Sequence, residues 1–102
     1  MRRRGLQAQI EIFELHRGPE VLARLQIAGH DKDWWFANIY PTPLFETIRP
    51  LFREPADDED SKMLREQLRE QNITMHVLDH HVLEFTMIVD GTRACLKFDK
   101  VE

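Results

Sequence analysis

The feature that most constrains this chain is an aromatic-rich stretch near its middle, Trp34–Phe52. Every aromatic side chain except Phe13, Phe85 and Phe98 lies within it. A large ring removes about 150 Å² or more from water when it is buried, and a chain of 102 residues folds around a single hydrophobic core. We therefore expect one domain, residues 1–102, with its core built on this stretch.

The N-terminal part of the chain predicts three strands. Apolar residues alternate over 8–16 and again over 21–27, and Gly18-Pro19 between them favours a turn, so these strands form a hairpin. A polar loop over 28–33 leads into a third strand, Trp34–Tyr40. Because both of its faces carry large apolar side chains, we expect this strand to be central in the sheet or covered by a helix.

A proline-framed helix is predicted to follow the third strand. Thr42 before Pro43 is typical of a helix start, since a hydroxyl caps free amides and proline at the first helical position loses no hydrogen bond. Pro50 would remove a donor inside the helix. We therefore expect this helix to end or kink near Arg49.

A second helix is predicted from the acidic run Asp57–Asp60 to about Gln71. One carboxylate of the run caps the helix, and the others suit the positive end of its dipole. Leu64 and Leu68 mark a narrow apolar side. Asn72 suits the left-handed position that ends a helix.

The last third of the chain predicts a three-stranded meander. Asp90-Gly91 is a strong two-residue turn signal and places Phe85 opposite Leu96 on an apolar face. A three-residue loop, 79–81, pairs Met75 with Phe85 upstream. The predicted fold class is α+β: a mostly antiparallel sheet of about six strands, with two helices between the third and fourth strands packed on one face, and residues 1–7 as a flexible tail.

The predicted register places His76, Glu84 and Lys97 in one polar row on the outer face of this meander. An imidazole beside a carboxylate is a pairing that acid–base catalysis uses, so the row is a candidate ligand-facing surface. The alternative is the solvated side of an antiparallel sheet, with Glu84 and Lys97 as a cross-strand charge pair.

The candidate partner-binding surface combines the acidic run with one tryptophan as a contact anchor: Asp57, Asp58, Glu59, Asp60 and Trp35. The run lacks the alternating ligands and central glycine of a calcium loop. Contact with a basic protein is one interpretation, and helix capping with solvation is the other. An exposed Trp35 would anchor a partner, whereas a buried one would belong to the core.

No pattern of residues indicates a cofactor, a metal centre or an activated nucleophile. His80 and His81 adjoin Asp79 in a predicted turn, where neighbouring side chains diverge rather than converge on a metal. Cys95 has no base among its predicted neighbours. The sequence assigns no role to His30.

Composition and charge narrow the class of protein. The formal charge of −4 disfavours nucleic acid as a partner, because phosphate binding needs clustered cations; the counter-signal is the run Arg2-Arg3-Arg4. No apolar run approaches the roughly 20 residues that cross a bilayer. A lone Cys95 fits a reducing compartment, so we expect a cytoplasmic protein.

The segment Tyr40–Phe52, with a hairpin before it and Ile88–Ala94 after it, resembles a family of bacterial proteins of about this length that has no assigned activity. The shared features are an aromatic strand, a proline-framed helix and a C-terminal Asp-Gly hairpin. The resemblance implies a stand-alone bacterial domain, and it carries over no catalytic or binding residue.

The sequence therefore favours a non-catalytic interaction or binding domain. We expect it to engage a basic partner through the acidic run or to associate with a second copy of the chain. The alternative is a small-molecule binder or minor enzyme that uses a cavity between helices and sheet, where the aromatic strand would supply an apolar lining.

Overall fold

The computed structural model describes residues 11–77, 80–82 and 84–100, so the predicted tail, 1–7, lies outside the described residues. Its elements in chain order are β2 (Ile12–Arg17), β3 (Glu20–Asp31), β4 (Trp34–Pro41), the 3₁₀ turns η1 (Pro43–Thr47) and η2 (Arg49–Leu51), α1 (Asp58–Glu70), β5 (Ile73–Val77), β6 (His80–Val82), β7 (Glu84–Asp90) and β8 (Arg93–Lys100).

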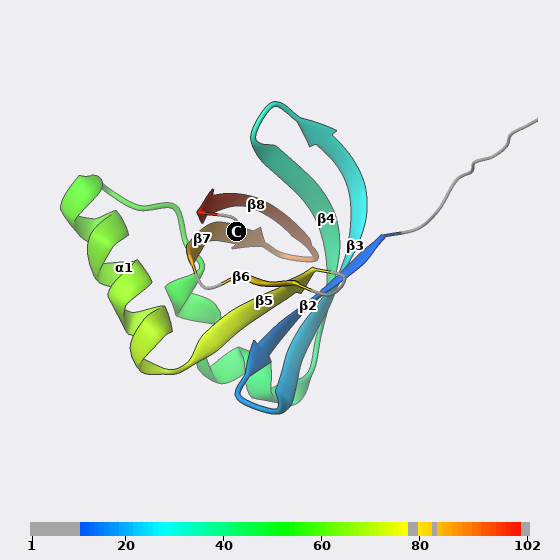
Figure 1. Ribbon diagram of the computed structural model, residues 1–102, viewed down its shortest axis with the longest axis horizontal. Coiled ribbons are helices and arrows are strands. Elements are labelled where there is room, and N and C mark those ends of the chain that lie inside the picture. Colours follow the sequence, from blue (N-terminus) through cyan, green and yellow to red (C-terminus); the bar gives the residue numbers. More distant parts are fainter. Residues whose placement is uncertain (1–10, 78–79, 83, 101–102) are drawn as a thin grey trace, which may run out of the picture.

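The strands form one curled sheet in the order β6-β5-β2-β3-β4-β8-β7, and neighbouring strands pair antiparallel (Figure 1). Phe13 on β2 and Phe98 on β8 are three strand positions apart, a distance of about 14 Å in a flat sheet. Their ring centroids lie 5.8 Å apart, so the sheet wraps around its interior. The predicted α+β class with a mostly antiparallel sheet is confirmed.

Strand β3 carries two bulges that bend the sheet. Leu22 is an extra residue opposite β2, and Ala28 is an extra residue opposite β4. Bulges of this kind increase local twist and curvature. The predicted loop 28–33 was therefore too long: β3 continues through the second bulge, and only Lys32 and Asp33 turn, with Lys32 at a left-handed φ of 58°.

Strand β4 is central, as its composition predicts, and lies between β3 and β8. Its alternate residues divide between two environments. Ala37 and Ile39 are buried on the concave side. Phe36 and Tyr40 on the convex side are exposed.

The proline-framed helix was predicted wrongly, because the segment forms two 3₁₀ turns instead. Amides bond three residues back, as from Ile48 to the Phe45 carbonyl at 2.9 Å. Pro50 has no N–H for a longer ladder. Thr42 does not cap a helix; its hydroxyl donates to the Leu22 carbonyl at 3.0 Å and ties the segment to β3.

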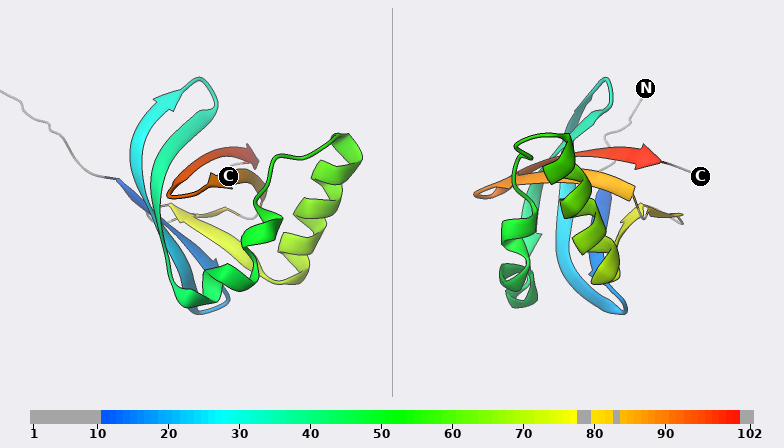
Figure 2. Two further views of the ribbon diagram at one scale, coloured as in Figure 1. Left: turned by 180° about the vertical axis from the view of Figure 1, so that it is seen from behind. Right: turned by 90° about the vertical axis from the view of Figure 1, so that its left-hand side faces the viewer.

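The acidic run begins α1 as predicted. The Asp57 carboxylate accepts a hydrogen bond from the Asp60 amide at 2.8 Å, Leu64 and Leu68 are buried, and Asn72 has a left-handed φ of 58°. Placement of the helix differs from the prediction. The one α-helix among the described residues packs across β5 and β7, near opposite edges of the sheet, instead of two helices on one face (Figures 1 and 2).

The predicted meander was wrong because its first strand belongs to the other edge of the sheet. Strand β5 pairs with β2, with Met75 opposite Leu15, and β6 continues from β5. Strand β7 pairs with β8 and forms the other edge. The Val89 amide on this edge donates to the Phe52 carbonyl at 2.8 Å, which anchors the 3₁₀ segment.

The turn between β7 and β8 is shifted by one residue from its prediction. Asp90 pairs with Arg93, so Gly91 and Thr92 are the central residues, with Gly91 at φ 64°. Glycine at the first central position suits this class of hairpin turn. Cross-strand pairs therefore move by two residues, and Phe85 lies opposite Phe98. A shift of two preserves the faces, which explains why the apolar side was predicted correctly.

The hydrophobic core fills the concave side of the sheet. It includes Phe45 and Phe52, whose rings stack at 5.5 Å and close one end of the interior. The other core residues are Phe13, Leu15, Leu22, Ala23, Leu25, Ala37, Ile39, Ile48, Leu68, Ile73, Met75, Phe85, Met87, Ala94 and Leu96.

Candidate functional site

The predicted polar row of His76, Glu84 and Lys97 is not formed. His76 lies on β5 and Lys97 on β8, with β2, β3 and β4 between them in the sheet order. Glu84 lies 3.6 Å from the Arg69 guanidinium of α1. The error follows from the wrong strand order, since the row assumed that β5 and β7 were neighbours.

His76 instead joins a cluster on β2, β3 and β5. Its ring stacks on His16 with centroids 3.7 Å apart. The Glu14 carboxylate makes hydrogen bonds with His16 at 2.9 Å and with Arg24 at 3.1 Å. These bonds, the one to His16 foremost, hold the pKa of Glu14 below its ordinary value. Glu14, Arg24, His76 and Ile12 line an open hollow of about 400 Å³.

No group of three His, Cys, Asp or Glu side chains in the described part of the chain is arranged to hold a metal ion. His80 and His81 lie in strand β6, not in the predicted turn. His30 stacks on Trp35, with ring centroids 4.0 Å apart.

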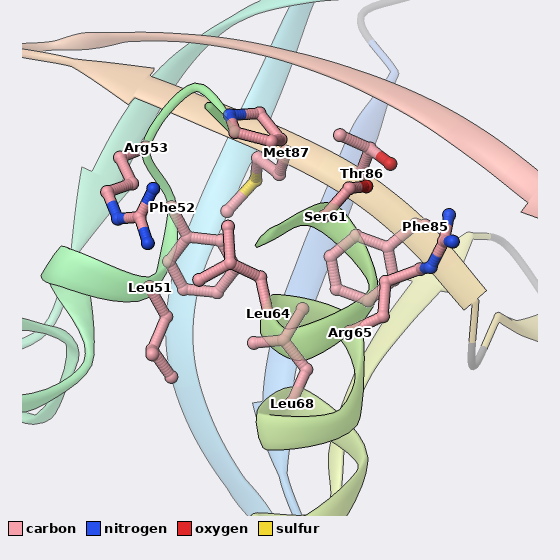
Figure 3. A pocket seen from close by; sticks show the side chains of 11 residues that line it. Leu51, Phe52, Arg53, Ser61, Leu64, Arg65, Leu68, Phe85, Thr86 and Met87 are labelled. Atoms are coloured by element: carbon pink, nitrogen blue, oxygen red, sulfur yellow. The ribbon is translucent and has the colours of Figure 1, made fainter. Parts of the chain in front are cut away.

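The space between α1 and the sheet is small. Leu64 and Leu68 point from the helix toward Phe52, Phe85 and Met87 and close it (Figure 3). The remaining volume is about 20 Å³, which is room for about one water molecule. A small organic ligand does not fit there.

The acidic run contains two carboxylates that stabilise the start of the helix and two that are exposed to solvent. Asp60 accepts hydrogen bonds from the Arg53 guanidinium at 2.5 and 2.8 Å and from the Ala56 amide at 2.8 Å. These bonds, first those from Arg53, lower the pKa of Asp60 to about 2. Asp57 is occupied as the helix cap. Asp58 and Glu59 are exposed and form no ion pair among the described residues.

An acidic hollow lies between the start of α1 and the convex face of the sheet. Its volume is about 330 Å³, and the residues that line it include Glu54, Asp57, Asp58 and Trp34. Lys97 shares this hollow, with its ammonium 6.0 Å from the centre of the Trp34 ring. Three carboxylates against one ammonium leave the hollow negative.

An apolar groove adjoins it on the same face. The register places Phe36 beside Cys95 and Cys95 beside Ile88, so these side chains form one row across β4, β8 and β7. The groove has a volume of about 600 Å³, and Arg93 is among the residues that line it. Phe36 is 45% exposed. Burial, with a smaller contribution from Glu54, raises the pKa of Cys95, which disfavours the reactive thiolate.

Trp35, the predicted contact anchor, points to the concave side. Its ring packs edge-on against Phe13, with centroids 5.5 Å apart, and it lies against the core. The aromatic side chains on the convex face are Trp34, Phe36 and Tyr40, and the first two line the hollow and the groove. Alternation along β4 separates these two sets, but the sequence alone did not indicate which set faces solvent.

Glu54 and Ile88 are site residues that sequence reasoning missed. Their convergence depends on where α1 and β7 meet, which is a long-range property of the fold.

No helix in the described ranges is long and apolar enough to span a bilayer. Comparison with protein-family models, curated proteins and solved structures finds no match to this chain. The resemblance to a bacterial family therefore stays a prediction.

Proposed function

We propose that this protein is a non-catalytic interaction domain that binds a basic partner through the convex face of β4, β8 and β7. The observation that carries the proposal is the acidic hollow, which Glu54, Asp58 and Trp34 line together. Carboxylates attract a cationic side chain over long range, and an indole face stabilises it on contact.

The apolar groove supports the same proposal independently of charge. Interaction surfaces join a desolvated apolar centre to a polar rim. Phe36 and Ile88 provide the apolar centre, and the acidic hollow provides one side of the rim. Cytoplasmic location is part of the proposal, because a lone Cys95 fits a reducing compartment.

The alternative of a small-molecule binder has less support. It required a cavity between helix and sheet, and the space there is about 20 Å³. The hollow beside His76 is open and lined by only a few residues.

Calorimetric titration with a hexa-arginine peptide tests the proposal. The double variant E54Q/D58N should bind at least about fivefold more weakly, because it removes two of the three carboxylates of the hollow. The matched control is E59Q/E66Q, which removes the same charge from exposed positions of α1 outside the hollow and should change the affinity less than about twofold.

Two results would contradict the proposal. Absence of measurable binding to the wild-type protein would remove its premise. An equal loss in both double variants would show that the peptide responds to net charge rather than to this hollow.

A further inference from the structure

The acidic hollow and the apolar groove are adjacent parts of one surface. Ile88 lines both. Trp34 in the hollow and Phe36 in the groove are two residues apart on β4, so they share the convex face. Two residues along a strand span about 6.6–6.8 Å. A ligand that fills both therefore carries a cationic and an apolar group separated by about this distance.

A third row on the same face continues this spacing. Asn38 lies opposite Arg93, and Arg93 lies opposite Asp90, next to the row of Phe36. Along β4 the surface thus presents three successive convex-face positions at strand pitch: Trp34 in the acidic hollow, whose carboxylates come from the segment that leads into α1, then Phe36 in the apolar groove, then Asn38 in a polar row. Side chains on one side of an extended segment repeat at this same pitch, whereas those of a helix match it only in pairs.

We propose that the partner binds as an extended segment with a cationic side chain two residues away from an apolar one. This inference rests on the proposed function and specifies its ligand. The cation occupies the hollow between Trp34 and Asp58, where the net negative charge favours it. The apolar side chain lies in the groove between Phe36 and Ile88, where it covers the half-exposed phenyl ring.

Three peptides of identical composition test the spacing. They are acetylated and amidated versions of Gly-Arg-Gly-Leu-Gly-Gly, Gly-Arg-Leu-Gly-Gly-Gly and Gly-Arg-Gly-Gly-Leu-Gly, titrated into the full chain. The first should bind at least about threefold more tightly than the others, because only its Arg and Leu reach both sites from one extended backbone.

The variant F36S tests whether the groove binds the leucine side chain of the peptide. It should remove the preference among the three peptides, because the leucine loses its contact surface. Y40S is the matched control, since Tyr40 is exposed on the same face of β4 but outside both hollows, and it should keep the preference.

The failures of the two proposals are distinguishable. Binding of all three peptides with equal affinity, or tighter binding of another spacing, overturns the extended-segment inference and leaves the acidic partner site standing. Tighter binding of an alanine-based helical peptide with Arg and Leu four residues apart also overturns it. Absence of binding by every peptide, hexa-arginine included, overturns both proposals.

Discussion

Trp35 and Phe36 are neighbours in the chain and lie on opposite faces of β4. Trp35 packs against Phe13 and His30 at the margin of the core, whereas Phe36 is 45% exposed and lines the apolar groove. The same contrast separates Ile39 from Tyr40. Aromatic content alone therefore does not locate a core: the sheet's curvature decides which face of an aromatic strand is buried and which is left for contact.

The largest expected effect is a difference in the free energy of unfolding between variants of two adjacent residues of β4. Ile39→Ala should lower the free energy of unfolding by about 2–5 kcal/mol, because it leaves a cavity on the concave side. Tyr40→Ala should change it by less than about 0.5 kcal/mol, because the ring is exposed. Chemical denaturation of both variants measures the difference, and similar losses would show that the convex face is also packed.

A smaller difference in stability is expected within the acidic run, between the helix cap Asp57 and the exposed Asp58. Asp57→Ala should cost about 1 kcal/mol, because it removes the cap that accepts from the Asp60 amide. Asp58→Asn should cost only a few tenths of a kcal/mol through the helix dipole. Thermal unfolding checks both variants. A larger loss of stability from Asp58→Asn would show that the Asp58 carboxylate also stabilises the helix.

Lys97→Met should strengthen binding of hexa-arginine by about two- to threefold, because Lys97 is the cation that now shares the acidic hollow. Lys62→Met on the exposed side of α1 is the matched control and should have a smaller effect. Titration calorimetry at low salt measures both. Weaker binding by Lys97→Met would mean that Lys97 contacts the partner directly.

The smallest effect is the pH dependence of the Arg53–Asp60 pair, which is exposed and screened by solvent. The pKa of Asp60 is lowered to about 2 from an ordinary value of 3.8. Its stabilising contribution is therefore complete above the unfolded value and is lost as pH falls from about 4 toward 2. The difference in melting temperature between wild type and Asp60→Asn should shrink over that window. A difference that stays constant with pH would contradict the role assigned to the carboxylate.

Local signals in the sequence predicted the local elements well. A helix cap within the acidic run, the left-handed Asn72 and the alternation of β4 depend on residues close together in the chain, and each was predicted correctly. The proline-framed helix was predicted wrongly because Pro50 was expected only to end or kink an α-helix near Arg49. Instead, the whole segment forms 3₁₀ turns.

Strand order was beyond the reach of these signals. Met75 has an apolar partner in either arrangement, since Leu15 on β2 serves as well as the predicted partner Phe85 on β7. Alternation determines which face a side chain occupies but not which strand lies beside it. The acidic hollow depends on that order, because it joins the start of α1 to β4, β7 and β8.

Phe36→Ser gives the most direct test that one face of β4 holds the fold while the other binds, and it requires two measurements on one variant. We predict that the free energy of unfolding falls by no more than about 1 kcal/mol, well below the loss expected from Ile39→Ala, and that the affinity for Gly-Arg-Gly-Leu-Gly-Gly falls at least about fivefold. Marked destabilisation, or unchanged affinity in a fully folded variant, would contradict this division between the two faces.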